Sequence, residues 1–356
     1  MPVFLCLECG PALLAAACDK EPFPVDPSQG QRGDGIMLRV FNFQGNKVAE
    51  IHIEAENLAR TIAAAGWIDV LDPTEEERDE LEQYLRTELP ESDDVEEIES
   101  SARYFIDSAG MHVHSLFLGQ SEGRHTTVTV AFILQPDRLI SLREEDSPDF
   151  RLLRMRARRG QIEAGNPLDF LLSIFEHKVE NLADTLEDIH RELEKVSEMV
   201  LEEAQAAEGH LEEAIGELAR LENSNGKVRL CLMDTQRSIS FLQKHQRYPA
   251  EHFATAHDIM RDVETLLSHT TFLFEKINFL MDTAQGFINI EQNQVIKIFS
   301  IAAVVFLPPT MVASIYGMNF QFFPELGWRY GYLWALAVMV VSGIAPYWYF
   351  KRKGWL

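Results

Sequence analysis

"YGMNFQFFPEL", residues 316–326, joins two long apolar stretches near the end of this 356-residue chain. No charged residue lies between Lys297 and Glu325, and none lies between Arg329 and Lys351. Each of these runs is close to or above the roughly 20 residues that a helix needs to cross about 30 Å of hydrocarbon. The sequence therefore predicts two membrane-spanning helices joined by a short loop.

The distribution of basic residues predicts the orientation of these helices. The chain ends with Lys351, Arg352 and Lys353, whereas the loop carries Glu325 and Arg329 and has no basic excess. Lysine and arginine collect on the cytoplasmic side of membrane proteins. We therefore expect both the C-terminus and the large N-terminal part in the cytoplasm, with the short loop outside.

The net charge of −24 limits the classes of partner. Non-specific binding to nucleic acid is not expected, because phosphates favour a basic surface. Dissolved cations would be attracted instead. An acidic surface that only keeps a cytoplasmic domain soluble explains the charge equally well.

Residues 1–36 differ from the rest of the chain. They hold a Cys6-x-x-Cys9 pair, an alanine-rich patch and a Pro/Gly/Asp-rich tail, but they lack the basic start of a signal peptide. We expect a disordered or spurious extension. A lipidated export signal is the alternative, and it would contradict the topology predicted above.

Residues 37–165 predict a cytoplasmic α/β domain. Alternating apolar residues on both sides of Gly45-Asn46 indicate a hairpin. Asp72 as N-cap, followed by Pro73, predicts a helix that ends near Leu89. The expected strands are residues 38–43, 47–53, 67–71, 103–106, 111–118, 127–134 and 139–143.

Residues 166–290 predict a bundle of long helices. Apolar residues recur at three- and four-residue steps from Phe175 to Val200, which is typical of helices packed side by side. We expect a turn at residues 223–226, a break at 245–249, and then one helix from Glu251 to about Ile315. At about 1.5 Å per residue, that last helix would be roughly 100 Å long.

One face of the first predicted span holds every hydroxyl group between Val295 and Ile315, together with small and apolar residues. The residues of this face follow at helical spacing: Asn293, Ile296, Ser300, Ala303, Leu307, Thr310 and Ser314. Such a stripe suits either close helix packing or the lining of a pore. Pro308-Pro309 frees carbonyl groups one turn earlier, which is tolerable beside a water-filled cavity or another helix.

The loop after this span carries a possible ion filter. The amide oxygen of Asn319 can accept hydrogen bonds from the water shell of Mg²⁺, an ion that dehydrates reluctantly. Gly317 permits a tight departure of the backbone from the helix end. Glu325 could concentrate cations at the entrance. A Gly-Met-Asn turn that merely joins two helices is the alternative.

Tyr316-Gly317-Met318-Asn319, followed by Pro324-Glu325-Leu326, resembles the signature of the CorA family of magnesium channels. The likeness covers nearly all of residues 37–356, and it includes the segments KVRLCLMDTQ (227–236), FINIEQN (287–293) and YFKRKGWL (349–356). It implies an α+β membrane protein with an N-terminal α/β cytoplasmic domain, a long-helix bundle that forms a funnel, and two C-terminal transmembrane helices.

The resemblance also implies a division of the chain. Residues 37–165 would be the α/β domain, 166–290 the long-helix stalk, 291–315 the first, pore-lining transmembrane helix, 316–330 the external loop, 331–350 the second transmembrane helix, and 351–356 a basic cytoplasmic tail. The protein would be a homopentamer in the bacterial inner membrane.

The site residues follow from the resemblance by position. The family's selectivity asparagine falls on Asn319 within the Gly317-Met318-Asn319 triplet, its pore threonine on Thr310 and its cytoplasmic-end asparagine on Asn293, and Glu325 stands at the entrance. The hydrophobic constrictions fall on Phe299 and Leu307, with Ile296 and Ala303 on the same stripe. Phe299 lies beside the strict stripe and differs from the leucine or methionine expected there.

The implied function is Mg²⁺ influx, with Co²⁺ and Ni²⁺ as further candidate ions. Mg²⁺ would be both the transported and the regulatory ion, and no resident cofactor is implied. A zinc transporter of the same superfamily is the first alternative, although its loop generally lacks Pro-Glu-Leu. A membrane-anchored coiled-coil scaffold is the second. An enzyme would have to rest on His112-x-His114, without further ligands at suggestive spacing.

Overall fold

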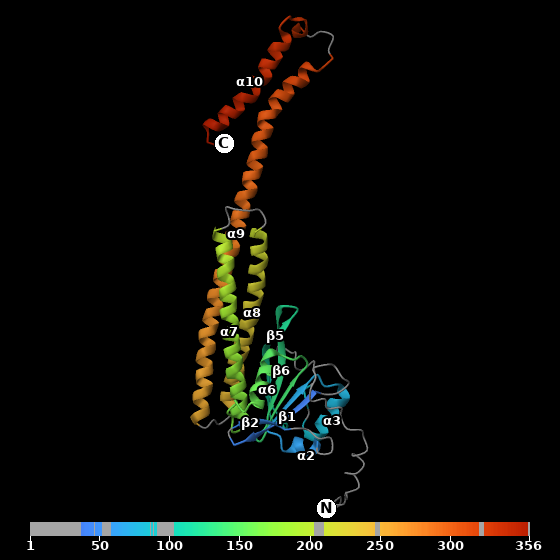
Figure 1. The fold of residues 1–356 in the computed structure, drawn as a ribbon, viewed down its shortest axis with the longest axis vertical. Helices are drawn as coiled ribbons and strands as arrows, with labels where there is room; N and C mark the ends of the chain where they lie inside the picture. The colour runs from blue at the N-terminus through green and yellow to red at the C-terminus, as the bar shows by residue number, and fades with distance from the viewer. Residues whose placement is uncertain are drawn as a thin grey trace, which may run out of the picture. The chain divides into compact units, whose positions relative to one another are not determined.

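A computed structural model describes residues 37–45, 47–51, 58–85, 87, 89–90, 103–202, 210–245, 250–319 and 324–354 (Figure 1). The predicted extension at 1–36 lies outside the described residues, as does Asn46 of the predicted hairpin turn. The chain divides into two compact units. One comprises Met1–Ser197 and Gly216–Asn278, and the other Glu198–Ile215 and Phe279–Leu356.

A seven-stranded mixed sheet forms the centre of the first unit. Its strands are β1 (Met37–Gln44), β2 (Lys47–Ile51), β3 (Trp67–Leu71), β4 (Tyr104–Ile106), β5 (Met111–Ser121), β6 (Arg124–Leu134) and β7 (Leu139–Arg143). They lie in the order β2-β1-β3-β7-β6-β5-β4. Only the β3–β7 pair is parallel among these strands. The predicted hairpin and strand pairs are confirmed.

The two faces of the sheet carry different side chains, because successive strand residues point to opposite sides. One face holds aliphatic residues such as Val40, Ile68 and Ile133, which form one core with residues of α2 (Leu58–Ala63) and α3 (Glu75–Leu85). The other face carries rings such as Phe132, which stacks on Phe150 of α6 (Pro148–Arg158). The sheet is thus a middle layer between two sets of helices.

The start of α3 differs from the prediction. The helix begins at Glu75, and Asp72 has a positive φ of 50°. Thr74 caps the helix instead. Its backbone N–H donates to Glu77 Oε2 at 2.8 Å, and the Glu77 N–H donates to Thr74 Oγ1 at 3.4 Å. This reciprocal capping box satisfies two otherwise unpaired donors, and the helix ends at Leu85 rather than near Leu89.

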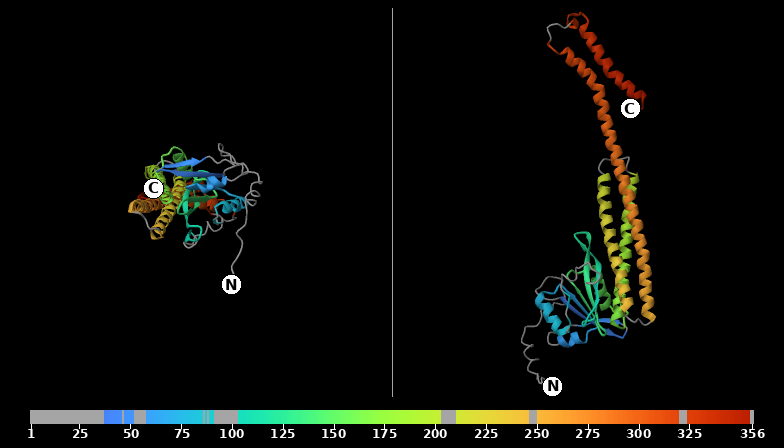
Figure 2. Two further views of the ribbon diagram at one scale, coloured as in Figure 1. Left: turned by 90° about the horizontal axis from the view of Figure 1, so that it is seen from below. Right: turned by 180° about the vertical axis from the view of Figure 1, so that it is seen from behind.

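Three long helices follow the sheet: α7 (Pro167–Glu202), α8 (His210–His245) and α9 (Ala250–Tyr316). Within the first unit, α7, α8 and the first part of α9 lie side by side next to the sheet (Figures 1 and 2). The predicted break before the last long helix is confirmed, since α8 ends at His245 and α9 begins at Ala250.

The turn predicted at residues 223–226 is wrong, because α8 continues through it. Asn225 is buried, and its Nδ2 donates to the backbone carbonyl of Thr270 on α9 at 2.9 Å. Ser224 is buried as well. Contact with a neighbouring helix therefore overrides the turn preference of this polar segment.

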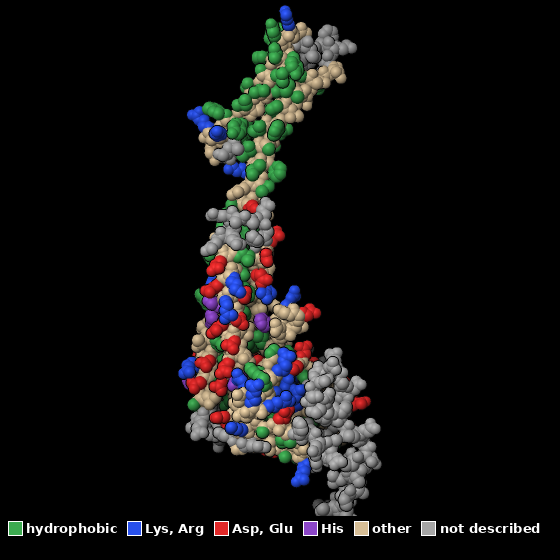
Figure 3. All heavy atoms as spheres, in the orientation of Figure 1, with side chains coloured by type: hydrophobic (Ala, Val, Ile, Leu, Met, Phe, Trp, Pro, Cys, Tyr) green, Lys and Arg blue, Asp and Glu red, His purple; other side chains and the backbone are tan. Residues whose placement is uncertain are grey.

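The end of the chain forms a helical hairpin. After α9, a short 3-10 helix, η3 (Pro324–Gly327), precedes α10 (Gly331–Arg352). The segment Phe253–Tyr316 of α9 contains a stretch that is long and apolar enough to cross a membrane, and so does the helix α10. Hydrophobic side chains cover the visible face of this hairpin, whereas acidic and basic side chains dominate on the bundle (Figure 3).

Candidate ion pathway

The last part of α9 has two different faces. The residues that are partly covered recur as one row: Ile301, Val305, Pro308, Pro309, Val312 and Tyr316. The predicted polar stripe, Asn293, Ile296, Ser300, Ala303, Leu307, Thr310 and Ser314, is exposed at every position. At 3.6 residues per turn these rows lie on roughly opposite sides of the helix. The second span therefore leaves the stripe uncovered.

Gly343 of α10 lies close to the proline pair of α9. A Cβ added to Gly343 would lie 3.2 Å from Pro309 Cγ and 3.6 Å from the Val305 carbonyl oxygen. Proline at 309 cannot donate to that carbonyl. The helix α9 nevertheless stays helical through Pro308 and Pro309. The proline pair thus lies where α9 packs against α10, and a neighbouring helix makes the lost hydrogen bond tolerable. Gly343, which permits this contact, is a residue that sequence reasoning missed.

Thr310 presents acceptor oxygen to the uncovered side. Its hydroxyl donates to the Phe306 carbonyl of the same helix at 2.8 Å. Once its proton is used in this bond, the oxygen still has lone pairs that can accept. An exposed hydroxyl in this state suits a cation or the water shell of a cation.

The α9 helix ends at the Gly-Met-Asn triplet. The Gly317 N–H donates to the Ala313 carbonyl at 2.9 Å, and the Met318 N–H donates to the Ile315 carbonyl at 3.2 Å. Gly317 does not adopt a positive φ, but a Cβ there would lie only 3.2 Å from the Ala313 oxygen. This glycine therefore permits close approach to the Ala313 carbonyl oxygen, and it is not required for a left-handed backbone conformation. Met318 and Asn319 are exposed.

Glu325 lies in η3, and its side chain is outside the described side chains, as are residues 320–323 of the loop. The structure therefore does not bring Glu325 and Asn319 together or separate them.

The residues predicted to form hydrophobic constrictions are among the most exposed apolar side chains described. Phe299 is 71% exposed, Leu307 64% and Ile296 61%, and Ala303 is also exposed. Contiguous apolar surface of this kind marks contact with lipid or with other protein surfaces. These side chains need an environment that one copy of the chain does not supply.

A buried polar cluster, which the sequence analysis did not single out, links the sheet to α7 and α8. Asp234 of α8 accepts from the Ser115 hydroxyl at 2.6 Å and from the Leu116 N–H at 2.8 Å. Lys178 of α7 donates to Ser115 Oγ at 2.9 Å, and burial lowers the pKa of its ammonium group. Asp234 lies within the segment 227–236 quoted above, and a carboxylate on an otherwise apolar helix face was the available signal.

The two strand histidines are buried. His112 Nε2 lies 3.0 Å from Asp107 Oδ1, and burial lowers the pKa of His114 to about 4. His114 is therefore neutral at pH 7. Among the described residues, no group of three or more His, Cys, Asp or Glu side chains is arranged to hold a metal ion.

The fold and the uncovered stripe define the class: a two-span membrane protein with a large α/β and helical part outside the apolar segments. The chain belongs to the family described as CorA-like Mg²⁺ transporter protein, whose model matches residues 63–352. It is 47% identical over 321 residues to the magnesium transport protein CorA of Salmonella typhimurium, covering 90% of this chain and 100% of the relative.

Solved structures share the fold at lower identity. The complete CorA magnesium transporter of Methanocaldococcus jannaschii matches with a TM-score of 0.67 and 18% identity, over 92% of this chain and 100% of that one. The cytoplasmic domain of ZntB from Vibrio parahaemolyticus matches with a TM-score of 0.53 and 11% identity, over 71% of this chain and 98% of that one. The predicted α/β domain, long helices and C-terminal hairpin are confirmed as this fold.

Proposed function

We propose that this protein is a channel that carries Mg²⁺ into the cytoplasm down its electrochemical gradient, with Co²⁺ and Ni²⁺ as further permeant ions. The observation that carries the proposal is the exposed row on α9 from Asn293 to Ser314, which includes the hydroxyl groups of this span and lies opposite the face that α10 covers. A single α9–α10 pair leaves this row facing outward. Close relatives that are named magnesium transport proteins support the choice of ion.

Several copies arranged with their stripes inward would enclose a path. We place residues 291–315 of each copy around the pore, residues 331–350 outside them, and both termini on the cytoplasmic side of the bacterial inner membrane. The number five comes from the family resemblance. The exposure of Phe299 and Leu307 supports the assembly, because neighbouring copies and lipid would cover such apolar side chains.

Selection would take place on hydrated ions. A ring of Asn319 amides, held at the end of α9 by Gly317 and Met318, would accept hydrogen bonds from the waters around Mg²⁺. Thr310 and Asn293 would repeat such acceptors along the stripe, and Glu325 would raise the local cation concentration. Neutral acceptors bind the hydrated ion weakly enough for it to leave again.

Gating would use the apolar positions of the same row. Rings of Phe299 and Leu307, with Ile296 and Ala303, would close the path by excluding water. Cytoplasmic Mg²⁺ bound between the acidic domains would reduce their repulsion and favour the closed state. If conductance were the same with and without Mg²⁺ on the cytoplasmic face, this feedback would be wrong.

Mg²⁺ uptake into proteoliposomes tests the proposal. We expect flux with the intact protein and a loss of most of it in Asn319→Ala. Ser342→Ala is the matched control, because it removes a polar group from α10, where the Ser342 hydroxyl donates to the Met339 carbonyl at 2.9 Å. Equal flux in all three proteins would remove Asn319 from the filter. Absence of flux in an intact, properly assembled protein would favour the scaffold.

Competition between Mg²⁺ and Zn²⁺ distinguishes the proposed magnesium channel from a zinc transporter. The ZntB match shows only a shared fold. We expect excess Mg²⁺ to suppress Zn²⁺ uptake and excess Zn²⁺ to leave Mg²⁺ uptake largely intact. The opposite pattern would assign the protein to zinc transport.

A further inference from the structure

A group of arginines forms an unusual surface on this acidic chain. Five of the nine residues from 151 to 159, at the end of α6, are arginine, although the whole chain carries a net charge of −24. Together with Arg39 of β1, four of them line a cavity of about 320 Å³, the arginine pocket: Arg39, Arg151, Arg154, Met155, Arg158 and Arg159. Figure 3 shows the blue side chains gathered on this part of the molecule.

The floor of the arginine pocket is fixed by buried ion pairs. Asp69 bonds to both Arg143 and Arg154, the latter at 3.4 Å. Arg154 also donates to Asp146 at 3.1 Å, and its side chain is only 8% exposed. These guanidinium groups are held in place before any ligand arrives, which lowers the entropic cost of binding one.

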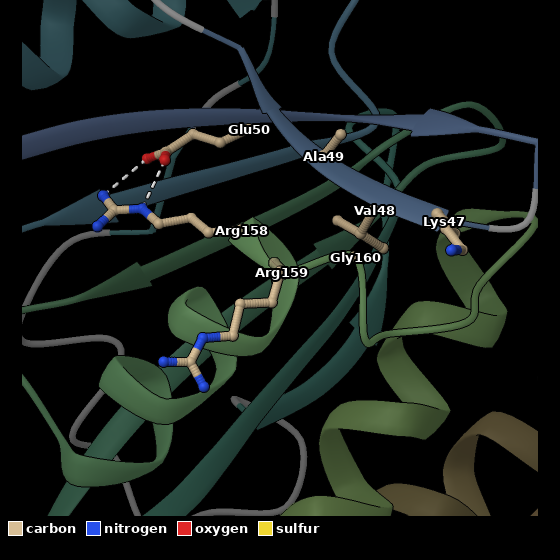
Figure 4. A pocket seen from close by; sticks show the side chains of 8 residues that line it. Lys47, Val48, Ala49, Glu50, Arg158, Arg159 and Gly160 are labelled. Carbon is tan, nitrogen blue, oxygen red and sulfur yellow. Dashed lines mark hydrogen bonds and ion pairs between the residues drawn. The ribbon is translucent and has the colours of Figure 1, made fainter.

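The other three α6-region arginines of the pocket, Arg151, Arg158 and Arg159, are exposed. Arg158 forms a two-pronged ion pair with Glu50, at 2.6 and 3.0 Å (Figure 4). Arg151 is 62% exposed and reaches only 3.9 Å from Asp146, which already bonds to Arg143 and Arg154. No acidic side chain among the described residues bonds to Arg159. Five guanidinium groups, those of Arg143 and of the four pocket arginines between residues 151 and 159, therefore share three carboxylates, those of Glu50, Asp69 and Asp146.

The surroundings of the pocket confirm the crowding of positive charge. Burial and then the charge of Arg154 lower the pKa of Arg39, and these effects outweigh the attraction of Asp69 and Asp146. An adjoining cavity of about 520 Å³ shares Arg158 and Arg159 and adds Lys47. Cavities of this size accommodate small ligands.

We propose that the arginine pocket binds a soluble anion with two or more linked phosphoryl groups, such as tripolyphosphate or a nucleoside triphosphate. Guanidinium groups match phosphate oxygens in two-pronged geometry, and several of them together favour a multiply charged ligand. Exposed ion pairs such as Arg151–Asp146 contribute little stability and yield easily to such an anion. The proposal does not depend on whether the protein transports Mg²⁺.

Calorimetric titration of the full-length protein in nanodiscs of neutral lipid tests this site. The titrants are tripolyphosphate and ATP in metal-free buffer, so that chelation of Mg²⁺ adds no heat. The test variant is Arg151→Gln/Arg159→Gln, whose side chains lie outside the buried ion pairs. The control is Arg124→Gln/Arg191→Gln, which removes two exposed arginines elsewhere in the first unit.

We expect tripolyphosphate to bind the intact protein and the control with the same affinity, and the test variant at least tenfold more weakly. Binding should also weaken as salt is raised. Equal affinity in the test variant, or no binding to the intact protein, would overturn the proposal. Glycerol 3-phosphate is a third titrant. If it bound as tightly as tripolyphosphate, one phosphate group would suffice and the proposed requirement for linked phosphoryl groups would be wrong.

Discussion

The sheet domain and the α9–α10 hairpin differ in how their apolar side chains are covered. In the sheet domain, apolar residues such as Val40, Phe132 and Ile133 are buried, and the charges that enter the interior are paired. In the hairpin, apolar residues such as Phe306 and Val341 are among the most exposed of the described chain. The first region satisfies its side chains within one chain, whereas the second requires lipid and other protein surfaces.

Both patterns, buried and exposed apolar side chains, occur along the single helix α9. Val263, Leu273 and Ile277 are almost fully buried, while Ile298 and Phe299 are more than 60% exposed. Apart from Pro308 and Pro309, which have no N–H to donate, the backbone is hydrogen-bonded within the helix in both parts, since an α-helix satisfies its backbone in water and in lipid alike. What changes along α9 is which residues neighbouring elements cover and, after Lys297, the absence of charged side chains.

The prediction with the largest expected effect removes a buried charge from the sheet domain. Asp69 is the shared acceptor of Arg143 and Arg154 and of the Ser141 hydroxyl at 2.9 Å. Asp69→Asn leaves buried guanidinium groups without their counter-charge. We expect the free energy of unfolding to fall by about 3–5 kcal/mol, measured by urea denaturation followed by circular dichroism.

The control for this test is Asp188→Asn, in an exposed ion pair with Arg191. It should change the free energy of unfolding by less than about 0.5 kcal/mol. If the two variants unfolded at the same urea concentration, the buried network would not be what holds the domain together.

A pH-dependent test probes how completely the first unit excludes water. Burial raises the pKa of Asp149 to about 6, even though the Asn181 amide donates to it at 2.6 Å. The folded state therefore holds this proton more tightly than the unfolded chain does. The associated stability is present below about pH 4 and is lost as pH rises through about 6.

Asp149→Asn should abolish this loss of stability at rising pH. At pH 7.5 we expect the variant to be more stable than the parent by at most about 3 kcal/mol, and the advantage should disappear toward pH 4. Urea midpoints of both proteins across this pH range measure the difference. A constant difference would mean that Asp149 is hydrated in the folded state.

In the hairpin, the most sensitive contact is the one at Gly343. Gly343→Leu would force a side chain against Pro309 and the Val305 carbonyl, which lie 3.2 and 3.6 Å from the added Cβ. Overpacking of this kind costs about 1–3 kcal/mol. Circular dichroism during SDS titration of the protein in mild detergent measures it. Val340→Leu, at an exposed position of α10, should change the midpoint little.

The sequence predicted what depends on local pattern. Charge-free runs predicted the two spans, and three- and four-residue spacing predicted the stripe from Asn293 to Ser314, which the structure leaves exposed. Alternation predicted the strands. The role of Asn319 stays a prediction, because selectivity belongs to an assembly of several copies.

Three of the failures share one cause, which is contact with residues distant in sequence. The polar segment 223–226 is helical because Asn225 bonds to Thr270, 45 positions away. Gly343 is required to be small only because α10 lies against Pro309. The helix α6 went unpredicted, although Ser147 caps it, and its Phe150 ring packs on Phe117 of the sheet. Local pattern contains none of these partners.

The smallest expected effect concerns an error of purely local origin. Asp72-Pro73 and Thr74-x-x-Glu77 are two overlapping helix-start patterns, and the structure selects the second. Thr74→Ala should lower the free energy of unfolding by about 1 kcal/mol, because the Glu77 N–H loses its acceptor. Asp72→Asn should have almost no effect, since asparagine tolerates the positive φ at this position and the Asp72 N–H still reaches the Arg143 carbonyl at 2.8 Å. Urea midpoints in the reverse order would restore Asp72 as the cap, and with it a helix that begins two residues earlier.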